Sequence, residues 1–238
     1  MIARVDTAPA LPDHADDLAR LLHLRQTYAD RGPGLEAWPA IPLPVLWEAS
    51  ILFTDIRGFT RLTERFAHDP AGLLDVLNAH LKRVLRSIAI CGGQVEKFVG
   101  DGVMATFGAS ASQPDHVDRA MAAAIGLIGA NEALNRRNAA EWGFRLEVGV
   151  GIASGPVVIG AVGSADRSEL GVLGDVVNVA ARLVTHAGPG EVLMTGTVYH
   201  AVADMLQSEL TNQSAVRGRS GRLEIYRMSL LGGRGDLA

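Results

Sequence analysis

Residues 94–107 read QVEKFVGDGVMATF, two apolar stretches on either side of a Gly-Asp-Gly triplet. Each stretch, Gln94–Phe98 and Val103–Phe107, is predicted to be a strand, because β-branched and aromatic residues bounded by turn-forming residues are typical of strands. The triplet Gly100-Asp101-Gly102 predicts a tight turn, since glycine lets the backbone bend sharply. The segment is therefore predicted to be a β-hairpin with an aspartate at its tip.

Upstream of this hairpin the sequence predicts a strand and then a helix. The short apolar run Ile51–Thr54 predicts a buried strand that leads into Asp55. The pair Asp69-Pro70 predicts a helix start, with an N-cap aspartate followed by proline at the first helical position. Apolar residues keep helical spacing from there until Gly92-Gly93.

Downstream of the hairpin we expect a helix opened by Pro114, a second hairpin, a further helix and a C-terminal strand. The second hairpin is expected from 145–153 and 157–162, around Ser154-Gly155-Pro156. The later elements are a helix from Asp175 to about Thr185 and a strand at Leu223–Tyr226. The order β-α-β-β-α-β predicts an α+β fold, a ferredoxin-like sandwich with additional C-terminal strands.

Composition divides the chain into three parts. Six of the ten prolines precede residue 50, which predicts a Pro-rich leader at 1–47, a main domain at 48–229 and a short tail at 230–238. Within the leader, Asp13–Tyr28 predicts one amphipathic helix. Such a helix packs on its own domain or docks on a regulatory partner, and the sequence leaves both open.

Charge and cysteine content exclude several classes of function. The net charge is −4 and no dense Lys/Arg run is present, which argues against nucleic acid or an anionic membrane as a partner. The single cysteine, Cys91, forms no intramolecular disulfide, and the chain has neither a signal peptide nor a spanning apolar run. We therefore expect a cytoplasmic protein.

Two aspartates stand where functional groups are common, at a strand end and at a hairpin tip. Asp55 opens DIRGFT (55–60), which predicts a turn whose backbone amides are placed to hold phosphates. If the first and second predicted strands, Ile51–Thr54 and Gln94–Phe98, are neighbours in the sheet, the two carboxylates converge. Such oxygen ligands suit Mg²⁺ or Mn²⁺ together with substrate phosphates. Either aspartate taken alone also fits a turn-capping role.

Three further polar residues interrupt apolar patterns. Lys97 lies within a strand that is otherwise largely apolar, while Asn178 and Arg182 share one face of the predicted helix that starts at Asp175. Taken singly, each fits an ordinary solvated surface as well as a functional role.

Taken together, these segments resemble a known family. ILFTDIRGFT (51–60), KFVGDGVMATF (97–107) and GDVVNVAARL (174–183) are similar, in order and separation, to the three signature blocks of class III adenylyl and guanylyl cyclases. The resemblance covers residues 48–229, about three quarters of the chain. It implies the class III nucleotide cyclase fold and an adenylate cyclase that converts ATP to 3′,5′-cyclic AMP and pyrophosphate.

The resemblance also implies a role for each matching position. Asp55, Asp101 and the carbonyl of Ile56 match ligands of two divalent cations per active site, Mg²⁺ or Mn²⁺. Asn178 matches the asparagine that orients the ribose, and Arg182 the arginine that meets charge on the α-phosphate. The substrate-binding matches are Lys97 at the purine edge, Gly58, Phe59 and Thr60 in the phosphate-binding turn, Gly171 beside the base, and Arg217 at the terminal phosphates.

In this family the active site is shared across a head-to-tail dimer. One subunit supplies the metal-binding aspartates, and the other supplies the base-reading residues with the asparagine and arginine. Because this sequence matches both halves, the resemblance implies a homodimer with two equivalent sites and an inactive monomer. The Arg217 match requires a one-residue insertion in the loop that follows it.

One departure from the family pattern concerns the base. Adenylyl cyclases usually carry Asp or Thr at the position of Gly171, whereas guanylyl cyclases usually replace the residue at Lys97 with Glu. Lys97 favours ATP, while Gly171 leaves GTP or a pyrimidine nucleotide open, because a site that lacks a hydrogen-bonding group discriminates poorly between analogues.

Three other interpretations can be weighed against this one. A diguanylate cyclase requires a Gly-Gly-Asp/Glu-Glu-Phe hairpin, and this chain has none. A silent nucleotide-binding regulatory domain would be expected to lose some of the metal-binding or Asn/Arg residues, and all four are kept. A competent domain inhibited by its leader helix stays open.

Overall fold

The computed structural model describes residues 44–109, 112–163, 168–203, 209–214 and 223–230. The predicted leader helix at Asp13–Tyr28 lies outside these residues. Eight strands form one mixed sheet with the order β2-β3-β1-β4-β6-β8-β7, and β5 pairs with β4 beside this path. The strands are β1 (Val45–Arg57), β2 (Gln94–Val99), β3 (Gly102–Phe107), β4 (Glu147–Gly163), β5 (Ser168–Leu173), β6 (Glu191–Thr195), β7 (Glu209–Ser214) and β8 (Leu223–Ser229).

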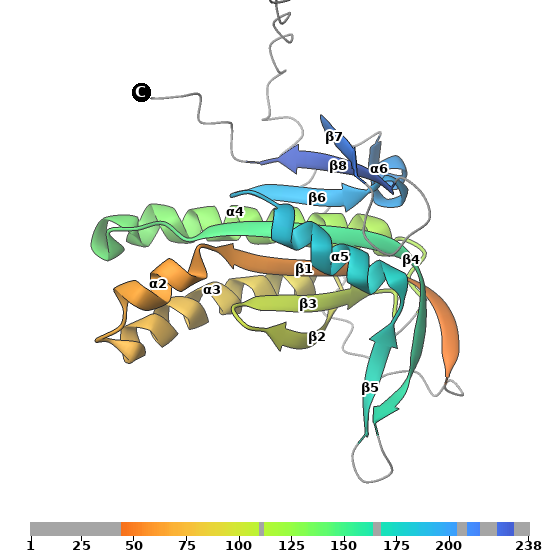
Figure 1. Ribbon diagram of the computed structural model, residues 1–238, viewed down its shortest axis with the longest axis horizontal. Helices are drawn as coiled ribbons and strands as arrows, with labels where there is room; N and C mark the ends of the chain where they lie inside the picture. Colours follow the sequence, from red (N-terminus) through yellow and green to blue (C-terminus); the bar gives the residue numbers. More distant parts are fainter. Residues whose placement is uncertain (1–43, 110–111, 164–167, 204–208, 215–222, 231–238) are drawn as a thin grey trace, which may run out of the picture.

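Helices lie on both faces of the sheet (Figure 1). The described helices are α2 (Phe59–Arg65), α3 (Pro70–Ile90), α4 (His116–Trp142), α5 (Asp175–His186) and α6 (Gly196–Val202). The order β1-α-β2-β3-α4-β4, with β4-β1-β3-β2 adjacent in the sheet, confirms the predicted ferredoxin-like α+β arrangement. The later strands β6, β7 and β8 extend the sheet beyond β4.

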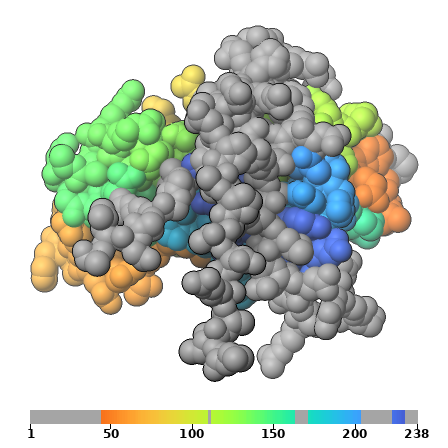
Figure 2. Space-filling view, turned by 90° about the horizontal axis from the view of Figure 1, so that it is seen from above, coloured from red at the N-terminus to blue at the C-terminus, as the bar shows by residue number. Residues whose placement is uncertain are grey.

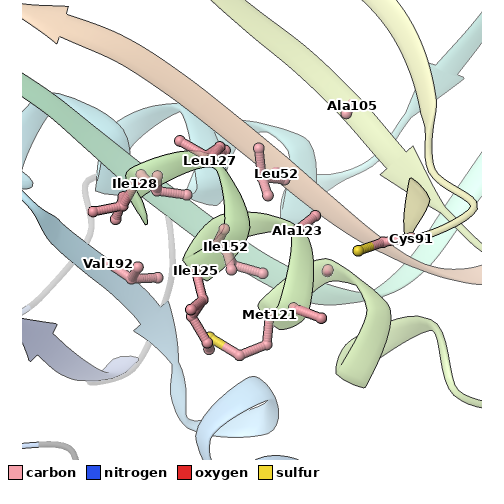
Figure 3. Close-up of a cluster of buried hydrophobic side chains, with 14 of the residues drawn as sticks. Leu52, Cys91, Ala105, Met121, Ala123, Ile125, Leu127, Ile128, Ile152 and Val192 are labelled. Carbon is pink, nitrogen blue, oxygen red and sulfur yellow. The ribbon is translucent and has the colours of Figure 1, made fainter. Parts of the chain in front are cut away.

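An apolar core lies on each face of the sheet, between the strands and the helices that cover them. On one face α3 and α4 pack against the central strands, and Figure 3 shows Leu127 and Ile128 of α4 beside Leu52 of β1, Ile152 of β4 and Val192 of β6. On the other face the apolar stripe of α5 packs against β1 and β4. The sheet is therefore covered on both sides at its centre, which explains the near-continuous burial of β1 and β3.

The predicted helix start at Asp69-Pro70 is confirmed. The Asp69 carboxylate accepts a 2.9 Å hydrogen bond from the backbone N–H of Gly72, and Pro70 is the first helical residue. The hairpin of β2 and β3, the helix from Asp175 and the strand from Leu223 are also confirmed. Helix α4 begins at His116, two residues after Pro114.

The predicted hairpin around Ser154-Gly155-Pro156 is wrong. Residues 147–163 form one continuous strand, β4, which pairs with β1 along the whole length of β1. Residues 150–152 of β4 pair with β6 and residues 158–163 pair with β5, and Pro156 lies between these two parts. Proline has no backbone N–H to donate, and at this position neither β5 nor β6 is there to accept a hydrogen bond from it. The turn comes later, between β4 and β5.

The first strand is also longer than the run Ile51–Thr54 that the sequence indicates. It extends through Asp55 to Arg57, and the turn begins only at Gly58, where φ is +72°. A third apolar cluster lies beyond this turn, where Leu62 of α2, Val76 of α3 and Leu134 of α4 meet. These helices together form one end of the molecule, orange and green in Figures 1 and 2.

Within the described residues, every helix is too short or too polar to cross a lipid bilayer.

Candidate active site

Asp55 and Asp101 converge at one end of the β1–β3 ladder. The register pairs Thr54 with Val103, which brings the β2–β3 turn beside the end of β1. Gly102 makes this approach possible, because a Cβ there would lie 2.1 Å from the carbonyl oxygen of Thr54. The backbone N–H of Ile56 donates a 2.9 Å hydrogen bond to Asp101 Oδ2, which fixes the hairpin tip against β1.

The two carboxylates are close enough to change the ionisation of Asp55. Burial, together with the hydrogen bond and charge of Asp101, raises the pKa of Asp55 to about 6, and Arg57 opposes this shift. The Arg57 guanidinium forms an ion pair with Asp55 Oδ2. Two partly buried carboxylates pressed together form a site whose repulsion a divalent cation would relieve, so these residues fit the predicted metal site.

The set of acidic ligands is small. Among the described residues no group of three or more His, Cys, Asp or Glu side chains is arranged to hold a metal ion. A pair of carboxylates matches Mg²⁺ chemistry, in which one or two protein carboxylates act with substrate phosphates and water.

The other residues predicted to bind phosphate are Gly58 in the turn after β1 and the first two residues of α2, Phe59 and Thr60. Gly58 and Thr60 are exposed, whereas Phe59 is partly buried and packs against the cluster around Leu62. The side chain of Phe59 therefore anchors the start of α2.

Lys97 lies on the edge strand β2 and is exposed. The ladder between β2 and β3 has an irregularity between Val95 and Lys97, after which Phe98 and Val99 are 56% and 48% exposed. The preceding Glu96 is anchored instead, because the Thr106 hydroxyl donates to its carboxylate at 2.6 Å. The end of β2 thus presents a lysine among exposed apolar side chains.

Asn178 and Arg182 are exposed on α5, on the face opposite its buried stripe. That stripe consists of Val176, Val179, Ala180, Leu183 and Val184. The helix therefore presents the polar pair outward, as the four-residue spacing predicts. Arg217 lies outside the described residues.

Gly171 lies far from the aspartate pair within one chain. On β4, Asp55 pairs with Gly149 and Gly171 pairs with Gly160, eleven residues farther along the strand. At the rise of an extended strand this separation is about 35 Å. Gly171 and Asp55 of one chain are therefore too far apart to contact the same small molecule.

A side chain across the β4–β5 hairpin occupies the space beside Gly171. A Cβ at position 171 would lie 2.7 Å from Cγ2 of Val162. Val162 is itself 41% exposed, so it presents an apolar surface at the place where a side chain on Gly171 would stand.

Sequence reasoning missed Arg57. Besides its ion pair with Asp55, it donates from Nη1 to the carbonyl of Thr185 at 3.4 Å, which links the aspartate to the end of α5. The signal was available: if β1 is extended through Asp55, then Arg57, two residues on, lies on the same side of the strand.

Comparison with known proteins decides the family. The family model described as the adenylate and guanylate cyclase catalytic domain matches residues 45–230. The chain belongs to this family. An adenylate cyclase of Anabaena cylindrica is 33% identical over 186 residues, which cover 74% of this chain and 36% of that protein.

Two solved cyclase structures resemble the fold. The adenylyl cyclase CyaB from P. aeruginosa is 31% identical with a TM-score of 0.68, covering 77% of this chain and 94% of that one. The guanylyl cyclase Cya2 is 29% identical with a TM-score of 0.71, covering 77% and 92%. The chain spans only 8% to 36% of the length of three adenylate cyclases that it matches.

Proposed function

We propose that this cyclase domain is an adenylate cyclase that converts ATP to 3′,5′-cyclic AMP and pyrophosphate. The observation that carries the proposal is the convergence of Asp55 and Asp101, fixed by the hydrogen bond from Ile56. The choice of ATP rests on Lys97, which is exposed at the end of β2, and on the similarity to proteins named adenylate cyclases.

In the reaction the ribose 3′ oxygen forms a bond to the α-phosphorus. The bond from that phosphorus to the oxygen bridging to the β-phosphate breaks, and the hydroxyl proton passes to solvent. Asp55, Asp101 and the carbonyl of Ile56 would hold two divalent cations, Mg²⁺ or Mn²⁺. Bound there, the cations would lower the pKa of the 3′-hydroxyl and would neutralise charge on the leaving pyrophosphate.

Protein groups have the remaining roles. Gly58 and the first two residues of α2, Phe59 and Thr60, hold the triphosphate, and Asn178 orients the ribose. Arg182 stabilises charge that grows on the α-phosphate oxygens in the transition state, for which a permanently charged, forked guanidinium is suited. Lys97 reads the adenine edge, and Arg217 holds the terminal phosphates.

The active form is a homodimer in which each site takes residues from both subunits. The separation of Gly171 from Asp55 within one chain supports this arrangement, because one nucleotide reaches both only if a second chain supplies one of them. Exposed apolar side chains around these elements also favour pairing. They are Phe98 and Val99 on β2, Val158 and Val162 on β4, and Leu173 on β5.

The test is to incubate the protein separately with ATP, GTP, CTP and UTP, with Mg²⁺ or Mn²⁺, and to identify the products by mass spectrometry. Cyclic AMP as the dominant product, lost in Asp101→Asn, is the expected result. Cyclic GMP as the dominant product would keep the mechanism and overturn the choice of ATP, an alternative favoured by Gly171 and by the likeness to Cya2. No cyclic product from any nucleotide would overturn the proposal.

A further inference from the structure

Arg57 lies between the aspartate pair and the helix that bears Asn178 and Arg182. From the end of β1 its Nη2 forms the ion pair with Asp55, and its Nη1 donates to the carbonyl oxygen of Thr185 at 3.4 Å. Only 18% of the Arg57 side chain is exposed. One largely buried guanidinium therefore joins a predicted metal ligand to the last turn of α5.

The end of α5 lies directly beside Asp55. In the sheet Asp55 pairs with Gly149 of β4, and a Cβ at Gly149 would lie 2.9 Å from the carbonyl oxygen of Ala187, which follows α5. Figure 1 shows the helix running over the sheet beside β4 and β1, with which it shares an apolar core. Because the strand and the helix end are this close, a small movement of the Arg57 side chain changes its contacts with both.

The hydrogen bonds of Arg57 are incomplete. Its Nε is buried, and within the described residues no acceptor bonds to it. The bond from Nη1 to Thr185 is longer than a typical hydrogen bond. A buried donor without an acceptor costs free energy, so the side chain gains by moving to a position in which more of its donors are paired.

Arg57 would leave Asp55 when that carboxylate binds a divalent cation, because the two positive groups compete for the same oxygens and repel each other. The end of α5 attracts the displaced guanidinium, since the last carbonyls of a helix lack intrahelical donors and carry partial negative charge. In the same turn the carbonyl oxygen of Arg182 is contacted by Thr185 Oγ1 and His186 Nδ1, each at 2.8 Å. The acceptor for Arg57 and the backbone of Arg182 thus belong to one hydrogen-bonded turn.

We propose that Arg57 is a positioning residue that moves from Asp55 to the carbonyl of Thr185 when the cation binds. The move fixes the last turn of α5 and, with it, the Arg182 side chain. This role rests on the proposed function, in which Asp55 holds a cation. In the proposed homodimer Asp55 serves one active site and Arg182 the other, so Arg57 links the two sites.

The first measurement is Mn²⁺ binding to the full chain by electron paramagnetic resonance, without nucleotide, at about pH 8, where Asp55 is ionised. Arg57→Gln should bind Mn²⁺ about fivefold more tightly, because no ion pair has to break. Arg57→Lys keeps the charge and should bind Mn²⁺ like the unmodified chain. Arg145→Gln is the matched control, since Arg145 pairs with Glu132 instead, and its Mn²⁺ affinity should not change.

The second measurement is hydrogen exchange in the last turn of α5, detected by mass spectrometry. On addition of Mn²⁺, exchange in residues 182–187 should slow by about threefold or more in the unmodified chain and in Arg145→Gln, because the turn opens less often. Arg57→Gln should show no such slowing, since it lacks the guanidinium that reaches Thr185.

Equal Mn²⁺ affinity in the unmodified chain and in Arg57→Gln would overturn the proposal. So would slowing that persists in Arg57→Gln, because α5 would then respond to the cation without Arg57. An unmodified chain that binds no Mn²⁺ would refute the metal site and this role together. Neither measurement depends on turnover, so the expected binding and exchange without any cyclic AMP would refute the proposed function and leave the link through Arg57 standing.

Discussion

The backbone N–H of Ile56 at the end of β1 donates a 2.9 Å hydrogen bond to the carboxylate of Asp101 at the tip of the β2–β3 turn. This bond places the Asp101 side chain beside Asp55 without using both of its oxygens. Because an amide oxygen can also accept from Ile56, the bond should survive replacement of Asp101 by asparagine.

Asp101→Asn should therefore separate catalysis from folding. We expect cyclase activity to fall by about a hundredfold or more, judged from the loss of a single charge-stabilising group in other active sites. The metal-free variant should melt at the same temperature as the unmodified chain or higher, because a repulsion with Asp55 is removed. Activity is measured as cyclic AMP formed from ATP, and stability by circular dichroism with a chelator. A variant that melts well below the unmodified chain would contradict this account of the contact.

Gly102 should be intolerant of any side chain. A Cβ there would lie 2.1 Å from the backbone oxygen of Thr54, so Gly102→Ala must push β3 away from β1. We expect a loss of about 1–3 kcal/mol in the free energy of unfolding, the usual cost of overpacking. Gly129→Ala is the control, because a Cβ at this helical position has no neighbour within 4 Å. That change should stabilise α4 by up to about 1 kcal/mol. Urea denaturation measures both, and equal effects would refute the steric argument.

Features that depend only on neighbouring residues in the chain were predictable from the sequence. The Gly-Asp-Gly hairpin, the cap at Asp69 and the helix from Asp175 follow from local rules on turns, caps and periodicity, and each is present in the structure. The convergence of Asp55 and Asp101 was predicted on the assumption that the first two strands are neighbours, and that assumption is wrong, because β3 lies between β1 and β2. The carboxylates still converge, because Asp101 lies in the turn that joins β2 to β3.

Features that depend on pairing partners were not predictable in this way. Ser154-Gly155-Pro156 has the composition of a turn, yet the long ladder to β1 keeps β4 extended through it. The approach of Val162 to Gly171 is a contact between two strands, which no periodicity within either strand reveals. The role of Arg57 was not predicted, because the apolar run ends at Thr54 whereas β1 continues to Arg57.

The metal-free protein should lose stability as pH rises through about 6. Burial and the neighbouring Asp101 raise the pKa of Asp55 from 3.8 to about 6, so the folded state holds a proton that the unfolded state has released. The stabilisation is fully present below pH 3.8 and is lost as pH rises through about 6. The difference in unfolding free energy between the unmodified chain and Asp55→Asn, measured against pH with a chelator, isolates this group. A difference in unfolding free energy that is constant between pH 4 and 7 would refute the raised pKa of Asp55 as a source of pH-dependent stability.

Val162 and Gly171 should be coupled in their effect on base selectivity. Gly171→Thr alone introduces a Cβ 2.7 Å from Val162, so we expect reduced stability and little gain in preference for ATP. In Gly171→Thr combined with Val162→Ala, the added hydroxyl has room to bond to the adenine amino group. The ratio of kcat/KM for ATP to that for GTP should then rise by about tenfold, as one specific hydrogen bond allows. Val162→Ala alone is the control and should leave the ratio nearly unchanged. Equal ratios in the unmodified chain, the two single variants and the double variant would mean that the base does not bind beside Gly171.

Two inactive variants should restore activity when mixed. Asp101→Asn damages the half-site at the end of β1, and Arg182→Ala damages the half-site on α5. If each site takes one half from each subunit, a mixed dimer contains one site with both defects and one that is intact. Mixing the two variants under conditions of subunit exchange should therefore yield cyclic AMP that neither produces alone. The control is a chain carrying both substitutions, mixed with either variant, which leaves no intact site. If the first mixture is as inactive as the control although exchange is demonstrated, both halves of the site come from one chain. The separation of about 35 Å along β4 between Gly171 and Asp55 must then be bridged in some other way.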